Sequence, residues 1–133
     1  MNAAFNKLDK DILPRICEIR IRKSGFVIVV IKSTSFFIEE SGEITEHPTH
    51  RCIKTDGEYV DKLFYKMCEY SVYSKTDSIR QGFITLKNGA RVGLSGTAVT
   101  DGGEIISVKD IASLSIRIPN EVKGCSISVL NCL

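Results

Sequence analysis

The stretch "SIRQGFITLKNGARVGLSG" (Ser78–Gly96) contains two extended segments around a turn. Gly82–Leu86 is rich in apolar and β-forming residues, and Ala90–Val99 has the same character after the turn. The dipeptide Asn88-Gly89 between them is a strong hairpin signal, because tight hairpin turns need positive φ angles that these residue types tolerate. The stretch therefore predicts an antiparallel hairpin, with a bend or bulge at the glycines of the return strand.

Further strands are expected on both sides of this hairpin. Ile16–Arg22 alternates between apolar and polar residues, which places Cys17, Ile19 and Ile21 on one face and the charged side chains on the other. Phe26–Ile31 is continuously apolar and β-branched, which predicts a strand buried on both faces. Shorter strands are predicted at Ser35–Ile38, Glu104–Val108 and Ser113–Pro119.

One long helix is predicted between the two β-rich halves of the chain, over Thr55–Ser74. Thr55 and Glu58 fit a capping box at its start. Apolar residues recur at helical spacing and form one core-facing stripe, made of Val60, Leu63, Phe64, Met67 and Cys68. In the segment Lys7–Pro14 we also expect a short helix that stops before the proline, and we expect the start of another helix at Asn120–Cys125. The predicted fold class is α+β, with a mostly antiparallel sheet or sheets packed on one long central helix.

The composition is that of an ordinary globular protein. The chain has 133 residues, of which 43% are hydrophobic and 26% charged, so we expect a single domain over residues 1–133. Its longest apolar run, Phe26–Ile31, is far too short to span a bilayer, and we expect no signal peptide near Met1. The five cysteines are odd in number and lack C-x-x-C spacing, which favours reduced thiols of a cytosolic protein; they are Cys17, Cys52, Cys68, Cys125 and Cys132.

The charge distribution is uneven but the net charge is small. A formal net charge of +2 does not by itself indicate a nucleic-acid-binding protein. The first 32 residues carry seven lysine and arginine residues against three acidic ones. Such a bias is mostly the mark of solvated faces, and it leaves a weak basic patch near the N-terminus open.

Several classes of catalytic site have no basis in the residues. The chain contains neither G-x-x-x-x-G-K-[ST] nor G-x-G-x-x-G, the phosphate-binding loops of nucleotide sites, and it has no G-x-S-x-G nucleophile elbow. His47, His50 and Cys52 could be combined with Cys68 as metal ligands, but their spacing is irregular, so we expect no metal site. Catalysis by this chain alone is therefore not expected.

Two motifs leave a binding function open. Gly93-Leu94-Ser95-Gly96 matches the G-x-x-G loop with which KH domains clamp an RNA backbone, although its flanks indicate strands rather than helices. Arg91 and Arg117 each lie in an extended apolar segment. They are either solvated strand residues with weak surface ion pairs or guanidinium groups directed at phosphate oxygens, and the pattern alone does not decide between the two.

A family resemblance follows from four segments that occur in order. They are "EIRIR" (Glu18–Arg22), "CEYSVYS" (Cys68–Ser74), "RQGFITLKNGARVGLSGTAV" (Arg80–Val99) and "IASLSIRIPNEVKGC" (Ile111–Cys125). Together they resemble the N-terminal region of the stage III sporulation protein AA family of endospore-forming Firmicutes. Each segment is weak alone, but the combination is specific.

The resemblance implies a role within a larger ATPase, similar to the traffic ATPases of type II and type IV secretion. In that family an N-terminal domain like this one precedes a RecA-like core that holds the P-loop and uses ATP and Mg. The resemblance implies that this chain binds no cofactor itself and is not an enzyme in isolation. The full-length protein would energise a channel between mother cell and forespore, at the cytoplasmic face of the mother-cell membrane. Its implied partners are its own core, neighbouring subunits of an oligomer and membrane proteins of the channel, with no nucleic acid.

The resemblance also implies a role for the arginines. In related secretion ATPases, arginines on strands of the N-terminal domain contact the nucleotide phosphates at the interface with the core, where they stabilise charge during phosphoryl transfer. On this analogy Arg91 and Arg117 are the first candidates for phosphate contact in the full-length assembly, and Arg80 is the third. The alternatives are a KH-like nucleic-acid-binding module and a plain protein-interaction domain without a nucleotide role.

Overall fold

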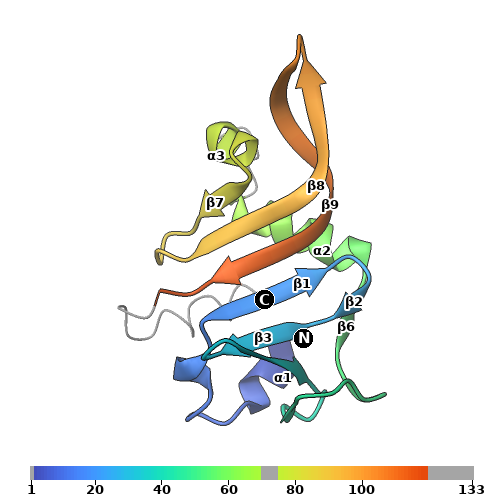
Figure 1. The fold of residues 1–133 in the computed structure, drawn as a ribbon, viewed down its shortest axis with the longest axis vertical. Helices are drawn as coiled ribbons and strands as arrows, with labels where there is room; N and C mark the ends of the chain where they lie inside the picture. Colours follow the sequence, from blue (N-terminus) through green and yellow to red (C-terminus); the bar gives the residue numbers. More distant parts are fainter. Residues whose placement is uncertain (1, 70–74, 120–133) are drawn as a thin grey trace.

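An antiparallel sheet of seven strands organises the structure, a computed structural model that describes residues 2–69 and 75–119 (Figure 1). In sheet order the strands are β5 (Ile44–Thr45), β4 (Thr34–Ile38), β3 (Ile28–Ile31), β1 (Glu18–Arg22), β9 (Glu104–Arg117), β8 (Arg91–Asp101) and β7 (Phe83–Thr85). A separate pair is formed by β2 (Gly25–Phe26) and β6 (Lys54–Thr55). The α+β class with a mostly antiparallel sheet is therefore confirmed.

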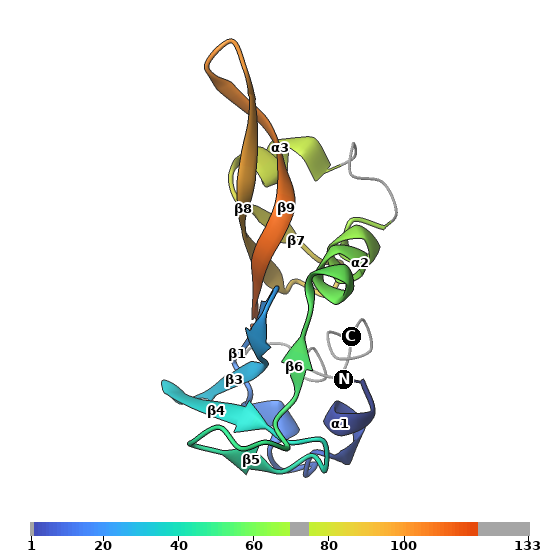
Figure 2. The same cartoon turned by 90° about the vertical axis from the view of Figure 1, so that its right-hand side faces the viewer.

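The helices cover one face of this sheet. They are α1 (Asn2–Lys7), the short 3-10 helix η1 (Leu13–Arg15), α2 (Gly57–Met67) and α3 (Thr76–Arg80). In the edge-on view, α1, α2 and α3 all lie on the same side of the strands (Figure 2). No helix of the described ranges covers the other side, which we call the open face and which is turned to the viewer in Figure 1.

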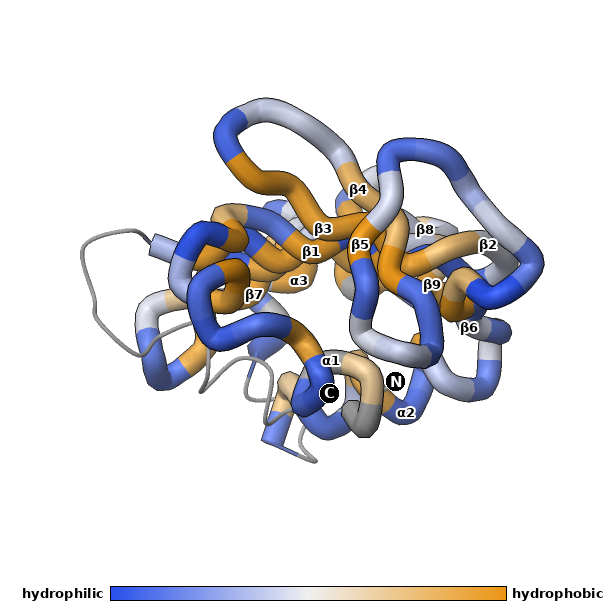
Figure 3. Tube along the Cα trace, turned by 90° about the horizontal axis from the view of Figure 1, so that it is seen from below, coloured by the Kyte–Doolittle hydropathy of each residue, from blue (hydrophilic) through white to orange (hydrophobic). Residues whose placement is uncertain are grey.

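The core is built on one row of apolar side chains that crosses five strands. Val29, Ile19, Ile116, Val92 and Ile84 are successive cross-strand partners from β3 to β7, and none of them is exposed to solvent. Complete burial of such a side chain contributes about 1.5–3 kcal/mol through the hydrophobic effect. Seen from below, the hydrophobic segments gather along the strands, and the hydrophilic segments lie mainly in the surrounding loops (Figure 3). This row fixes the register of the sheet.

The predicted hairpin is confirmed. Phe83 pairs with Gly93 and Thr85 with Arg91 across the turn, and Gly89 has a φ of 88° there. The strand predicted over Ser35–Ile38 also forms, as β4. The predicted burial of the Phe26–Ile31 run is largely confirmed, but the run is divided at Val27 into β2 and β3.

The prediction of two separate C-terminal strands was wrong. Residues 104–117 form the single strand β9, which pairs along its whole length with β8. The pairing shifts register near Gly96, where an added Cβ would lie 2.8 Å from the carbonyl oxygen of Lys109. Asp110 has a positive φ of 50° at this level. This β-bulge interrupts the alternation of residue types and made one strand look like two. Beyond it, the β8–β9 ribbon projects past the body of the sheet (Figure 1).

The expectation of one long central helix joining two β-rich halves was also wrong. Strand β1 from the first half pairs directly with β9 from the second, so the chain forms one continuous sheet. Helix α2 has only 11 residues and packs on β9 and β1. It is the only helix of more than six residues in the described ranges. It ends before Glu69, whose φ of 55° is left-handed; residues 70–74, which the prediction included, lie outside the described residues.

The predicted cap of α2 was wrong by one residue. The side chain of Asp56 accepts a hydrogen bond of 2.8 Å from the amide N–H of Tyr59 and thus caps the helix. The hydroxyl of Thr55 instead donates to the carbonyl oxygen of Arg22, at 2.6 Å. Both residue types cap helices well, and the bond from Thr55 to the end of β1 decides between them.

Two further helices were predicted near the ends of the chain. The helix predicted over Lys7–Pro14 was wrong, because α1 ends at Lys7 and Pro14 belongs to η1. The helix start expected at Asn120–Cys125 lies outside the described residues.

Truncation of the central row tests its importance. We expect Ile116→Ala to lower the free energy of unfolding by about 2–5 kcal/mol, because it removes buried methyl groups and leaves a cavity at the centre of the sheet. Urea denaturation followed by circular dichroism measures the loss. The matched control is Ile105→Ala on the projecting ribbon, where the side chain is 43% exposed and the loss should be below about 1 kcal/mol. Equal losses in the two variants would contradict the assignment of the core.

Removal of the helix cap is a second test. Asp56→Ala leaves an amide N–H of the first turn of α2 without its hydrogen bond, and should cost about 1 kcal/mol of stability. Thermal unfolding compares it with Asp61→Ala, an exposed change inside α2 that should be neutral or slightly stabilising. If the two variants melt at the same temperature, Asp56 does not act as the cap.

Candidate functional site

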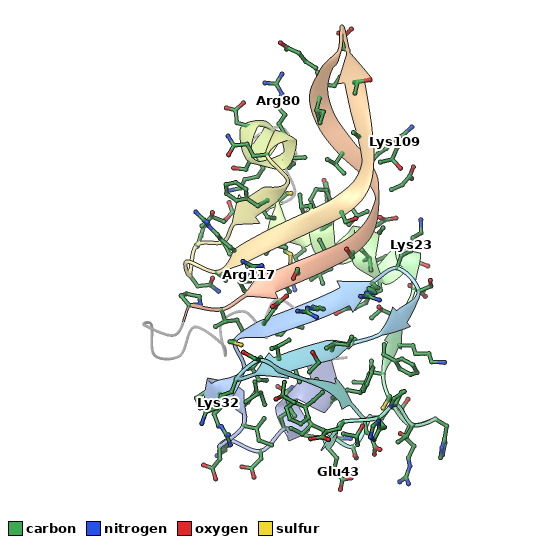
Figure 4. All side chains as sticks on the ribbon, in the orientation of Figure 1. Lys23, Lys32, Glu43, Arg80, Lys109 and Arg117 are labelled. Carbon is green, nitrogen blue, oxygen red and sulfur yellow. The ribbon has the colours of Figure 1, made fainter. Side chains whose placement is uncertain are left out.

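The open face carries a cluster of arginines that the strand register brings together. Arg91 on β8 is the direct cross-strand partner of Arg117 on β9, and Arg117 is in turn the partner of Glu18 on β1. Their neighbours in the adjacent apolar row point into the core, so these three side chains point to the opposite side. Figure 4 shows Arg117 in the middle of the sheet on this face. Two of the three predicted site residues are therefore neighbours.

A second row of partners lies beside the first. Arg20, Ser115, Gly93 and Phe83 follow one another across β1, β9, β8 and β7. Arg20, Ser115 and Gly93 are each two positions from a residue of the first row, and Phe83 is two positions from Thr85, the partner of Arg91, so all four face the same side of the sheet. Because Gly93 has no side chain, the surface is hollowed between the neighbouring residues.

The hollow is lined by Phe83, Arg91, Gly93, Ser115 and Arg117 and has a volume of about 210 Å³. Complete pockets for small molecules are larger, roughly 300–1,000 Å³. Two guanidinium groups, a hydroxyl and an aromatic ring thus border a space that could hold a phosphate but only part of a nucleotide. The hollow is suited to be one wall of a site.

Arg91 is oriented by an aromatic contact. Its guanidinium carbon lies 5.1 Å from the centroid of the Phe83 ring, a cation–π geometry. Within residues 2–69 and 75–119, no carboxylate forms an ion pair with Arg91 or with Arg117. Both charges are therefore available to an external anion.

Glu18 is the only carboxylate in the two rows described above. One of its oxygens, Oε1, accepts hydrogen bonds from Nε of Arg20 at 2.9 Å and from the hydroxyl of Ser115 at 2.6 Å. The bond from Arg20 is the main reason why the pKa of Glu18 lies below its ordinary value. Partial burial acts in the opposite direction and raises this pKa, whereas the hydrogen bond from Ser115 and the charges of Arg20 and Arg117 lower it further. With three arginines and one carboxylate, the cluster keeps an excess of positive charge.

Arg80 is not part of this cluster. It lies on α3, on the helix-covered side of the sheet, and its nearest carboxylate is that of Asp77 at 3.9 Å. Figure 4 shows it at the edge of the molecule, away from Arg117. The third predicted residue is thus separated from the other two.

Three residues of this surface, namely Arg20, Phe83 and Ser115, were not identified from the sequence. The alternation of "EIRIR" and "SLSIR" places Arg20 and Ser115 on polar strand faces. The missing information was the strand order β1–β9–β8–β7, which no local pattern supplies.

The G-x-x-G motif that suggested a KH domain has a different structural setting. Gly93-Leu94-Ser95-Gly96 lies inside strand β8 rather than in a loop between helices, so the KH interpretation of this motif was wrong.

Among the described residues, no group of three or more histidine, cysteine or acidic side chains is arranged to hold a metal ion. Cys17, Cys52 and Cys68 are free cysteines, and Cys125 and Cys132 lie outside the described residues.

None of the helices within residues 2–69 and 75–119 combines the length and the apolar character that crossing a bilayer requires.

The whole chain has known relatives. The profile of the family described as "Sporulation stage III, protein AA" matches residues 5–133. "Stage III sporulation protein AA" of Bacillus subtilis (strain 168) is 25% identical over 130 residues, which make up 98% of this chain. The chain spans 38% of the length of that relative. Because the family profile covers nearly the entire sequence, this chain belongs to the sporulation stage III protein AA family.

Proposed function

We propose that this chain is the N-terminal domain of a sporulation-specific, traffic-type ATPase, and that its open face forms one wall of the ATP site. Arg91 and Arg117 would contact phosphate oxygens of a nucleotide held by a P-loop core. The observation that carries the proposal is that these two arginines are direct cross-strand partners on the uncovered face of the sheet. Neither of them forms an ion pair with a carboxylate of the described residues.

Physical chemistry supports this use of the two arginines. Guanidinium groups present several fixed N–H donors that match phosphate oxygens, and they keep their charge at any physiological pH. In phosphoryl transfer, such groups stabilise the negative charge on the transferred group. The hollow of about 210 Å³ supplies no P-loop and no metal ligands of its own, which is consistent with a site completed by another domain.

The rest of the assignment follows from family membership and the resemblance to secretion ATPases. We propose that the complete protein assembles as an oligomer, uses ATP and Mg, and energises a channel complex between mother cell and forespore. Its partners would be its own core, neighbouring subunits and membrane proteins of the channel, at the cytoplasmic face of the mother-cell membrane. The isolated domain would not hydrolyse ATP, because the P-loop would lie in the core.

The direct test uses the complete reading frame that contains this chain. Its coding sequence should contain G-x-x-x-x-G-K-[ST] beyond the present 133 residues. In the purified full-length protein, Arg91→Ala and Arg117→Ala should each lower kcat for ATP hydrolysis by about a hundredfold or more, the scale expected for loss of a guanidinium at the transition state.

The matched control is Arg80→Ala, which removes an exposed arginine from outside the cluster. Its kcat should stay within about twofold of the wild type, since a surface ion pair of this kind contributes little. Circular dichroism confirms that the variants are folded. If Arg91→Ala and Arg117→Ala hydrolyse ATP as fast as Arg80→Ala, the nucleotide role is wrong and a plain protein-interaction domain is favoured.

A further inference from the structure

Arg20 extends the arginine cluster to a third strand. Arg20 lies on β1, Arg117 on β9 and Arg91 on β8, so the three guanidinium groups come from consecutive strands of the open face. Adjacent strands are about 4.8 Å apart, which places the first and third strands about 10 Å apart. Long side chains from these positions can converge on one extended anion more readily than on a single phosphate.

The contacts of Arg20 leave part of its guanidinium group free. Its hydrogen bond to Glu18 uses Nε, and the two terminal nitrogens form no ion pair with any carboxylate of the described ranges. The side chain is 42% exposed, whereas that of Glu18 is only 16% exposed. Arg20 is thus partly exposed at the surface and is hydrogen-bonded to a carboxylate that is more buried than the arginine itself.

Glu18 occupies the position at which a bound anion would compete. It lies between Arg20 and Arg117, and the hydroxyl of Ser115 donates to the same oxygen as Arg20 does. These donors are the types that bind phosphate oxygens, namely guanidinium N–H groups and a hydroxyl. Glu18 therefore satisfies, within the chain, two of the donors that a phosphate could otherwise bind, namely Nε of Arg20 and the hydroxyl of Ser115.

We propose that Arg20 is a third phosphate-binding residue of the open face, and that Glu18 is an internal carboxylate whose negative charge opposes polyphosphate binding there. The ligand class is a chain of phosphates, as in the tail of a nucleoside triphosphate. The choice of this ligand class rests on the proposed function, because a nucleoside triphosphate is the ligand of the proposed ATP site. Glu18 acts as a counter-ion that keeps the cluster partly neutralised until the ligand arrives.

Binding of inorganic tripolyphosphate to the 133-residue chain tests this inference without ATP turnover. In isothermal titration calorimetry at low salt, Glu18→Gln should bind tripolyphosphate about three- to tenfold more tightly than the wild type, because one negative charge is removed close to a polyanion. The charge-matched control is Glu58→Gln, whose carboxylate pairs with Lys62 on the exposed side of α2. It should leave the affinity unchanged.

A second pair of variants tests Arg20 itself. Arg20→Gln should weaken tripolyphosphate binding about tenfold, the effect of losing a charge-assisted contact, and Arg80→Gln should weaken it little. Orthophosphate, which is too short to span three strands, should respond less to Arg20→Gln than tripolyphosphate does. Thermal melts verify that all four variants are folded.

The inference is overturned if Glu18→Gln binds no more tightly than Glu58→Gln, or if Arg20→Gln behaves like Arg80→Gln. Absence of measurable binding by wild type and Glu18→Gln at millimolar tripolyphosphate also overturns it. These results are separable from the ATPase test. If turnover depends on Arg91 and Arg117 while Arg20→Gln and Glu18→Gln match their controls, this inference alone fails. If the binding results are as expected but the ATPase kcat is unchanged in Arg91→Ala and Arg117→Ala, the proposed function fails.

Discussion

The row of buried side chains centred on Ile116 is the constraint on which the rest of the structure depends. It crosses five strands from β3 to β7 with its members fully buried, so the register of every strand along it is set by burial. Because side chains alternate along a strand, the residue next to each member must point to the other face. The apolar row therefore places Arg117 beside Arg91 and beside Glu18. A slip of one residue in β1, β8 or β9 would turn the charged side chain of that strand into the core, at a large energetic cost.

The one-sided sheet gives the domain a free surface with a defined charge. Helices α1, α2 and α3 occupy one face, and over β1, β9 and β8 the open face carries arginines, Glu18, Ser115 and a hollow at Gly93. Positive charge collected on such a surface is unfavourable unless it is hydrated or paired, and Glu18 pairs only part of it. The same arrangement that stabilises the fold thus leaves a surface that is complementary to phosphates, and this complementarity connects the fold to the proposed role in an ATP site.

Local patterns in the sequence identified most of the strands, but not their order in the sheet. The Asn88-Gly89 turn identified the hairpin, as the structure confirms. Arg91 and Arg117 were expected on extended segments, and both lie on strands. Arg20 was not recognised as part of the site, because strand order depends on long-range packing. Two other errors arose where a residue other than glycine adopts left-handed backbone, at Glu69 and Asp110. Such positions carry no composition signal, so the end of α2 and the continuity of β9 could not be predicted.

A structure of the complete protein with Mg and a non-hydrolysable ATP analogue would test the role of the open face most directly. We expect the open face to lie against the nucleotide, with the guanidinium groups of Arg91 and Arg117 within about 3.2 Å of phosphate oxygens. This expectation would be contradicted by a complex in which another protein surface covers the open face, both arginines pair with carboxylates, and the nucleotide is bound elsewhere.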